Sequence, residues 1–221
     1  TVAGGTNSLG ITGNAVFGDG AGDTVTGVST LSVSGTSAIN TNTVTTSGTQ
    51  TYSGAVTLGA ATTLTTTDSA VSFGSTVDGA NDLTIASGTG TVGFTGAVGS
   101  GTALGDGTGA ALAVSGTGAV TFGSTVNTAS GLAITPNVSF GGNVTIAAGD
   151  TATTIGGTTT LGAAVTSFQA GRSVTFGDAV GDSITIAAGA GLTVSTTANN
   201  GNLEFWGGVS YSKALTLNTN G

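Results

Sequence analysis

The chain of 221 residues contains no His, Cys or Met, and its only cationic side chains are Arg172 and Lys213. Without His, the commonest general base near neutral pH is missing, and Ser-His-Asp and Cys-His sites are excluded within the chain. Zinc sites built from Cys or His are excluded for the same reason. Glycoside hydrolysis needs two carboxylates at a fixed separation, and nothing in the sequence marks such a pair. We therefore expect that the chain is not an enzyme.

Positive charge is scarce relative to negative charge. The 10 acidic residues bring the formal net charge to −8. Binding to DNA or RNA depends on Lys and Arg side chains that neutralise phosphates, and this chain has 2 of them. We expect no nucleic-acid partner.

Long apolar runs are also missing, because Thr, Ser, Gly or Asn interrupts each run, as around 110–114. A transmembrane helix needs about 20 mainly apolar residues, so we expect no membrane insertion. The sequence begins Thr1-Val-Ala without the basic start and apolar block of a signal peptide. We expect either that a leader was removed or that the chain is an internal piece of a longer protein.

Helix formers are nearly absent, whereas 42 residues are Gly, which costs about 1 kcal/mol relative to Ala inside a helix. A mean hydropathy of +0.37 is too high for a disordered chain. Short alternations such as Leu31-Ser-Val33 and Leu83-Thr-Ile85 predict strands, and the Gly, Asn, Asp and Ser clusters between them predict turns. The sequence predicts an all-β fold.

The strand-and-turn pattern repeats along the chain. Segment 71–85 matches 120–134 at an offset of 49 residues, and segment 57–74 matches 160–177 at an offset of 103. Such periodicity predicts a β-solenoid with about 20 residues per coil, roughly ten coils and a length on the order of 50 Å. An offset of 49 is not a whole number of such coils. Either some coils contain inserted loops or the repeat unit is larger, and stacked β-sandwich repeat modules are the alternative. Five recurring aromatics are expected to form an internal stack: Phe17, Phe73, Phe122, Phe140 and Phe176.

Three segments, 44–60, 73–80 and 94–104, resemble repeats of very large bacterial surface exoproteins, the filamentous-haemagglutinin-like β-strand-repeat adhesins. The resemblance covers residues 30–135 best. It implies a right-handed parallel β-helix, export across the outer membrane and an adhesive or filament-forming role. The Phe-Gly-Asp-x-x-Gly-Asp segments at 17–23 and 176–182 are also similar to repeats of marine phage fibre proteins.

Three pairs of Asp residues share an Asp-x-x-x-Asp spacing in Gly-rich turns. Calcium takes six to eight oxygen ligands, and such turns supply some of them. The other interpretation is that each Asp caps its turn by accepting backbone N–H groups, and we favour it because no calcium-loop motif is present. The candidate calcium ligands are Asp19, Asp23, Asp78, Asp82, Asp178 and Asp182. We expect no other cofactor.

Threonine-rich stretches such as 62–67 and 158–160 suggest an ice-binding surface. Ice binding needs the same Thr position in every coil, and the sequence does not display that regularity. Thr is also a common strand residue with a hydroxyl for a wet face, which is the interpretation that we prefer.

The last segment differs from the rest. We divide the chain into a β-solenoid repeat region, 1–198, and an atypical aromatic-containing coil or capping segment, 199–221. Phe205, Trp206 and Tyr211 lie close together in the second region. They form either an exposed platform for a sugar or protein partner, or the packing that covers one end of the solenoid.

The sequence as a whole predicts a non-enzymatic structural or adhesive module of a large bacterial protein, extracellular or exposed on the cell surface. Its expected partners are other copies of itself or neighbouring repeats, together with host surfaces or glycans. The alternatives are a segment of a viral tail fibre and a β-solenoid that binds ice or carbohydrate.

Overall fold

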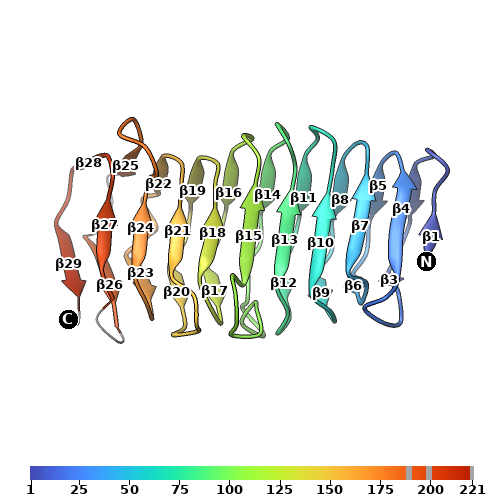
Figure 1. Cartoon of the computed structure of the whole chain (residues 1–221), viewed down its shortest axis with the longest axis horizontal. Helices are drawn as coiled ribbons and strands as arrows, with labels where there is room; N and C mark the ends of the chain where they lie inside the picture. The colour runs from blue at the N-terminus through green and yellow to red at the C-terminus, as the bar shows by residue number, and fades with distance from the viewer. Residues whose placement is uncertain (188–190, 198–200, 220–221) are drawn as a thin grey trace.

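The computed structural model describes residues 1–187, 191–197 and 201–219, and within them every element of secondary structure is a β-strand. The described residues include no helix that could cross a membrane. All paired strands are parallel, and the chain winds as a solenoid with its two termini at opposite ends of the long axis (Figure 1). The predicted parallel β-solenoid is therefore confirmed, and the sandwich alternative is excluded.

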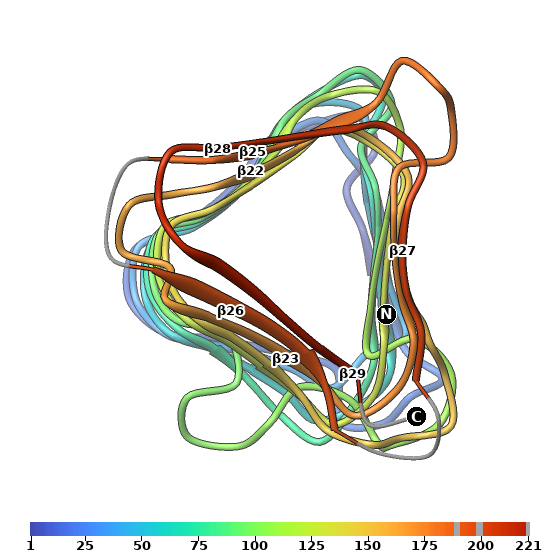
Figure 2. The same ribbon diagram turned by 90° about the vertical axis from the view of Figure 1, so that its left-hand side faces the viewer.

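Three sheets form the sides of the solenoid, and Figure 2 shows the triangular outline that they enclose. Sheet A contains β1 (Val2–Ala3), β4 (Thr24–Val28), β7 (Thr43–Thr46), β10 (Thr62–Thr65), β13 (Leu83–Ala86), β15 (Leu112–Ser115), β18 (Leu132–Ile134), β21 (Thr153–Ile155), β24 (Val174–Phe176) and β27 (Leu203–Phe205). Sheet B contains β2 (Leu9–Ile11), β5 (Leu31–Val33), β8 (Gln50–Tyr52), β11 (Val71–Phe73), β14 (Val92–Phe94), β16 (Val120–Phe122), β19 (Val138–Phe140), β22 (Thr159–Leu161), β25 (Ser183–Ile186) and β28 (Gly208–Tyr211). We number the coils from 1 to 10 by their strands in sheet A.

Sheet C has two parts. The first contains β3 (Ala15–Phe17), β6 (Ser37–Ile39), β9 (Val56–Leu58) and β12 (Val77–Asp78). The second contains β17 (Val126–Thr128), β20 (Val144–Ile146), β23 (Ser167–Ala170), β26 (Leu192–Thr196) and β29 (Leu215–Thr219). Val98 bridges Val77 and Val126, so the third side continues through coil 5.

Coil length explains the offset of 49 residues between the sequence repeats. Phe73 pairs with Phe94, 21 residues later, and Phe94 pairs with Phe122, a further 28 residues along the chain. The longer interval includes the segment 99–111, in which a loop after Val98 projects from the sheet C side of the triangle (Figure 2, green). The offset is thus two coils, one of which carries an inserted loop.

The core is built by strands of three residues in which the two outer side chains point inward and the middle one points out. Val71 and Phe73 are buried whereas Ser72 is exposed, and the same pattern recurs along sheet B. Because side chains alternate across a strand, this pattern lines the interior with Val, Ile, Leu and Phe from one end to the other.

Five aromatic rings stack face to face inside sheet B. The chain of contacts runs through Tyr52, Phe73, Phe94, Phe122 and Phe140, with ring centroids 4.8–5.3 Å apart and interplanar angles of 5–11°. The predicted internal stack is therefore correct for three of its five members.

The other two predicted members lie elsewhere. Phe17 is buried but belongs to β3 of sheet C, and Phe176 belongs to β24 of sheet A. Phe168 of sheet C meets Phe140 and Phe176 edge-on, at 89° and 65°. The segments 57–74 and 160–177, which match at an offset of 103 residues, therefore lie on different sheets. Phe73 belongs to sheet B, whereas its match, Phe176, belongs to sheet A. In coil 9 the position of sheet B that corresponds to Phe73 is occupied by Ile186.

One polar pair is enclosed in this core. The Tyr52 hydroxyl donates to Gln50 Oε1 at 3.1 Å, and Gln50 Nε2 donates to the carbonyl oxygens of Val44 and Thr65 at 3.1 and 3.0 Å. Both side chains have no exposed surface, and burial raises the pKa of Tyr52. The pair is satisfied by hydrogen bonds and therefore tolerable inside an apolar stack.

Candidate functional site

Sheet A carries outward-facing threonines in register on consecutive coils. Thr24 pairs with Thr43, Thr43 with Thr63, and Thr63 with Thr84, which makes one row across coils 2–5. Thr45 and Thr65 pair in a second row, two residues further along each strand. We call these six residues the threonine face.

The threonine face ends where alanine takes the same outward position. Thr84 pairs with Ala113, and Ala113 pairs with Ala133 on the next coil. Thr154 and Thr175 resume the row in coils 8 and 9. The regularity is thus confined to coils 2–5 and does not run through every coil.

The hydroxyls of the threonine face differ from those of neighbouring threonines in their hydrogen bonding. Thr46 Oγ1 donates to the carbonyl oxygen of Gly48 at 2.6 Å, and Thr62 Oγ1 donates to that of Thr41 at 2.9 Å. Within residues 1–187, 191–197 and 201–219, the six hydroxyls of the face make no hydrogen bond to another protein group. They are free to bind water or a ligand.

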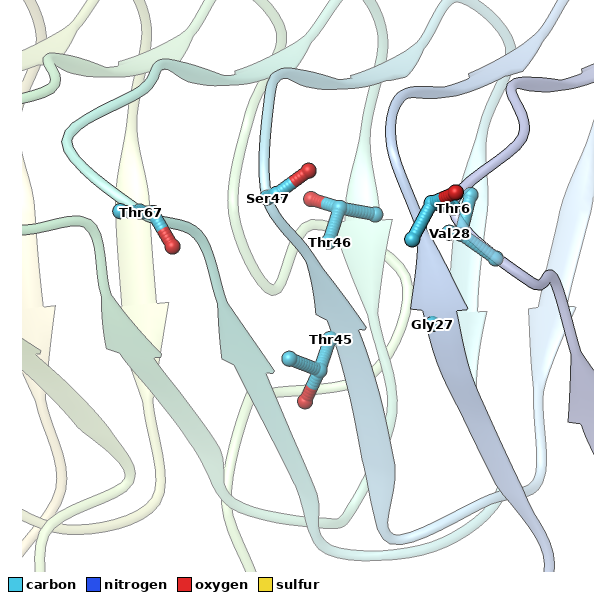
Figure 3. A pocket seen from close by; sticks show the side chains of 7 residues that line it. All are labelled: Thr6, Gly27, Val28, Thr45, Thr46, Ser47 and Thr67. Carbon is cyan, nitrogen blue, oxygen red and sulfur yellow. The ribbon is translucent and has the colours of Figure 1, made fainter.

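A shallow hollow of about 200 Å³ adjoins the second row of the face (Figure 3). A bulge in β4 between Val25 and Val28 shapes it, and Gly27 adopts a left-handed φ of 66° there. The lining carries five hydroxyl residues, one valine and one glycine: it consists of Thr6, Gly27, Val28, Thr45, Thr46, Ser47 and Thr67. Every hydrogen-bonding side chain of this wall is an uncharged hydroxyl.

The predicted calcium ligands lie on separate coils of the solenoid. Asp19 and Asp23 lie between β3 and β4, and Asp78, at the end of β12, and Asp82, just before β13, lie at the same corner between sheets C and A three coils further on. Asp178 and Asp182 lie at another corner, between β24 and β25. In the described ranges no three acidic side chains form a group that could hold a metal ion. The structure does not bring the three pairs together, and calcium binding stays a prediction.

The second Asp of two pairs accepts backbone hydrogen bonds within its own turn. Asp182 Oδ2 accepts from the N–H groups of Asp178 and Ala179 at 2.9 and 2.8 Å, which lowers the pKa of the Asp182 carboxyl. Asp23 Oδ2 accepts from the N–H of Asp19 at 3.1 Å. These carboxylates cap turns.

The middle pair reaches the next coil. Asp78 Oδ1 accepts from the N–H of Gly101 at 2.7 Å, and Asp82 Oδ1 accepts from that of Asp106 at 3.4 Å, so both hold the 99–111 loop. Burial raises the pKa of Asp82, and the negative charges of Asp106 and Asp150 add to the increase. The Asp82 carboxylate is thus held at a position where burial and neighbouring negative charges disfavour its ionised form.

The three predicted aromatic contact residues lie in coil 10 but do not form one platform. Phe205 stacks on Phe176 with ring centroids 5.6 Å apart and continues the interior. Trp206 and Tyr211 are 52% and 58% exposed. Tyr211 pairs in register with the buried Ile186, so it occupies an inward position of the last coil, whereas Trp206 follows β27 at the next corner.

Sequence reasoning named 62–67 as a threonine-rich stretch but missed the face. The signal was present, because Thr-x-Thr occurs at 24–26, 43–45 and 63–65 at spacings close to one coil. Coils of unequal length concealed it. The boundary that we placed between residues 198 and 199 lies outside the described residues.

Comparisons with protein-family models, with curated proteins and with solved structures find no match to this chain. Its role must therefore be argued from the solenoid itself and from the chemistry of its sides and ends.

Proposed function

We propose that this chain is a non-enzymatic, rod-like structural and adhesive module of a large extracellular protein on a bacterial surface. The observation that carries the proposal is one continuous apolar core through ten coils of parallel strands. A continuous core makes a stiff spacer, and parallel coils can be extended by those of a neighbouring repeat or of another copy.

The open ends expose positions that are buried in the middle of the rod. Leu217 pairs with the buried Val194 and is itself 51% exposed, and Val2 at the other end pairs with the buried Val25 and is 41% exposed. Unpaired strand edges of this kind bind other strands. Another copy of the chain, or a neighbouring repeat, matches the triangular end in shape and chemistry.

Head-to-tail stacking of this kind is heterologous and produces open filaments rather than closed rings. We expect the chain to form filaments with the width of one solenoid as its concentration rises, detectable by electron microscopy and by light scattering. Leu217→Lys places a charge on the open end and is expected to prevent this growth. Thr185→Lys, on the side of sheet B, is the control and is expected to leave it unchanged.

Two outcomes would contradict the proposal. Isolated monomers at every concentration would remove the basis for end-to-end assembly. A stable trimer, whose side faces are buried between copies, would instead support a segment of a viral tail fibre. For the surface location, proteolysis of intact source cells should release fragments of this region, and protection from protease would argue against exposure.

A further inference from the structure

The threonine face of sheet A has the spacing of a crystal surface. Residues two apart on a strand lie about 6.6 Å apart along it, and neighbouring strands lie about 4.8 Å apart. Oxygen atoms on a prism face of hexagonal ice repeat at distances close to these two. Because Thr43 and Thr45 are in register with Thr63 and Thr65, the backbone positions of these four threonines form a two-dimensional array with both spacings.

The hydroxyls of this array are uncommitted and restrained. They make no hydrogen bond to other protein groups in the described part of the chain, so they can each bind water. Thr43, Thr63 and Thr84 are half-buried, because each side chain packs between those of the adjacent coils. A β-branched side chain has few rotamers, and packing on both sides restricts them further. Because the threonine side chains are already ordered, the array can hold water in fixed positions without a further loss of side-chain entropy.

Charged residues lie only at the margins of the face. From Thr24 to Thr67 the sequence contains no Asp, Glu, Lys or Arg, whereas Asp23 precedes Thr24 and Asp82 lies two residues before Thr84. A charged side chain orients water radially around itself, which disrupts a lattice, whereas alternating hydroxyl and methyl groups impose no such orientation. An uncharged surface also has little attraction for ionic ligands.

The face is backed by coils of similar length. The coils that carry it follow one another at 19, 20 and 21 residues, as the pairs Val25–Val44, Val44–Leu64 and Leu64–Ile85 show. Viewed along the axis, the sheet A strands superpose along one straight side of the triangle (Figure 2). Aromatic stacking on the opposite wall begins in coil 3, at Tyr52.

We propose that the threonine face binds ice, with its hydroxyls occupying water positions of the crystal lattice. The same Thr position recurs on the consecutive coils 2–5, so the ice contact is confined to these coils and does not extend over the whole solenoid. This inference goes beyond the rod function, since a rod requires only the core and the ends. A neutral polysaccharide is the competing ligand. Sugar rings are commonly bound by stacking on an exposed aromatic, and Tyr52, the only aromatic residue between Thr24 and Thr67, has no exposed surface.

The test uses the full chain and three variants. Thr43→Tyr with Thr63→Tyr places two bulky rings on the face while keeping residues that favour strands. Thr154→Tyr with Thr175→Tyr makes the same change in the same outward row of sheet A, outside the face. Thr63→Lys adds one charge at the centre of the array and serves as a second disruption if the paired tyrosines prevent folding. Circular dichroism checks that each variant retains its β-structure.

We expect ice crystals grown with the unaltered chain to become faceted and to recrystallise slowly. The Thr154/Thr175 variant should retain both effects, whereas the Thr43/Thr63 variant and Thr63→Lys should lose them. Ice growth identical to that in buffer would overturn the proposal, as would equal loss in the control variant. Retention on insoluble cellulose or chitin that depends on Thr43 and Thr63, without an effect on ice, would assign the face to a polysaccharide instead.

Discussion

Coils 3–7 and coils 8–10 use aromatic residues differently. In the first region one Phe or Tyr per coil occupies the same position of sheet B, and the rings stack almost parallel. In the second region Leu161 takes that position, and the rings of Phe168 and Phe176 enter the core from sheets C and A. The interior remains filled in both regions, since Phe140, Phe168 and Phe176 stay in contact.

The same local segment can therefore build different sides of the triangle. Val71-Ser-Phe73 forms a strand of sheet B, and Val174-Thr-Phe176 forms a strand of sheet A. A segment of this kind specifies a strand with two inward side chains, followed by a turn. The side that it occupies depends on the number of residues in the preceding coils. The number of residues in each coil thus determines which sheet a segment joins, whereas the local sequence pattern determines that the segment forms a strand.

The largest effect is expected in the parallel stack. Phe94 is fully buried and stacks on both faces, so Phe94→Ala should cost about 3–5 kcal/mol of unfolding free energy. Because solenoid coils depend on their nearest neighbours, hydrogen exchange should accelerate in coils 4–6 and remain slow in coils 8 and 9. Uniform acceleration along the chain would mean that the two regions unfold as one unit.

A smaller effect is expected where the inserted loop leaves the sheet C side, directly after Val98. Gly99 has a φ of +69°, and a Cβ there would lie 1.9 Å from the carbonyl oxygen of Asn127, so Gly99→Ala should cost at least about 1–3 kcal/mol. Gly93, in the middle of a sheet B strand, has open space around its Cβ position and is the matched control. Gly93→Ala should be neutral or stabilise the chain by about 0.5–1 kcal/mol. Urea unfolding compares the two variants, and equal losses would show that the start of the loop imposes no special constraint.

The first ring of the stack permits a cycle of substitutions. Tyr52→Phe leaves Gln50 Oε1 buried without its donor and should cost about 1–3 kcal/mol. Adding Gln50→Leu removes the orphaned amide, and the double variant should recover part of that loss because an apolar pair fits this core. Thermal unfolding of the two single variants and the double variant measures the coupling. Strictly additive losses would indicate that the hydroxyl and the amide act independently.

The smallest effect is expected at Asp82. Its raised pKa in the folded state means that the folded chain binds a proton more readily than the unfolded chain, so this group opposes folding at neutral pH and does so less as the pH falls. Asp82→Asn keeps an oxygen to accept from Asp106 N–H and removes the charge. We expect its melting temperature to exceed that of the unaltered chain at neutral pH, with the difference shrinking in acid. A difference in melting temperature that grows as the pH falls would contradict this prediction.

Much of the fold could be predicted from sequence. Alternations such as Leu31-Ser-Val33 identified strands, and recurring Phe-Gly steps indicated a solenoid with about 20 residues per coil. The aromatic positions were harder, because Phe17 and Phe176 share a local motif with Phe73 but occupy other sheets. The threonine face was missed since its rows depend on a register that only coil lengths determine.

Stacking of the coils is tested most directly by distances between spin labels on sheet B, and the absence of native Cys makes the labelling specific. Ser32, Ser139 and Thr185 occupy the same outward row in coils 2, 7 and 9. With about 4.8 Å per coil, we expect about 24 Å between labels at 32 and 139 and about 34 Å between labels at 32 and 185. If the distance between labels at 32 and 185 is no longer than the distance between labels at 32 and 139, the coils do not stack in sequence order and the solenoid is contradicted.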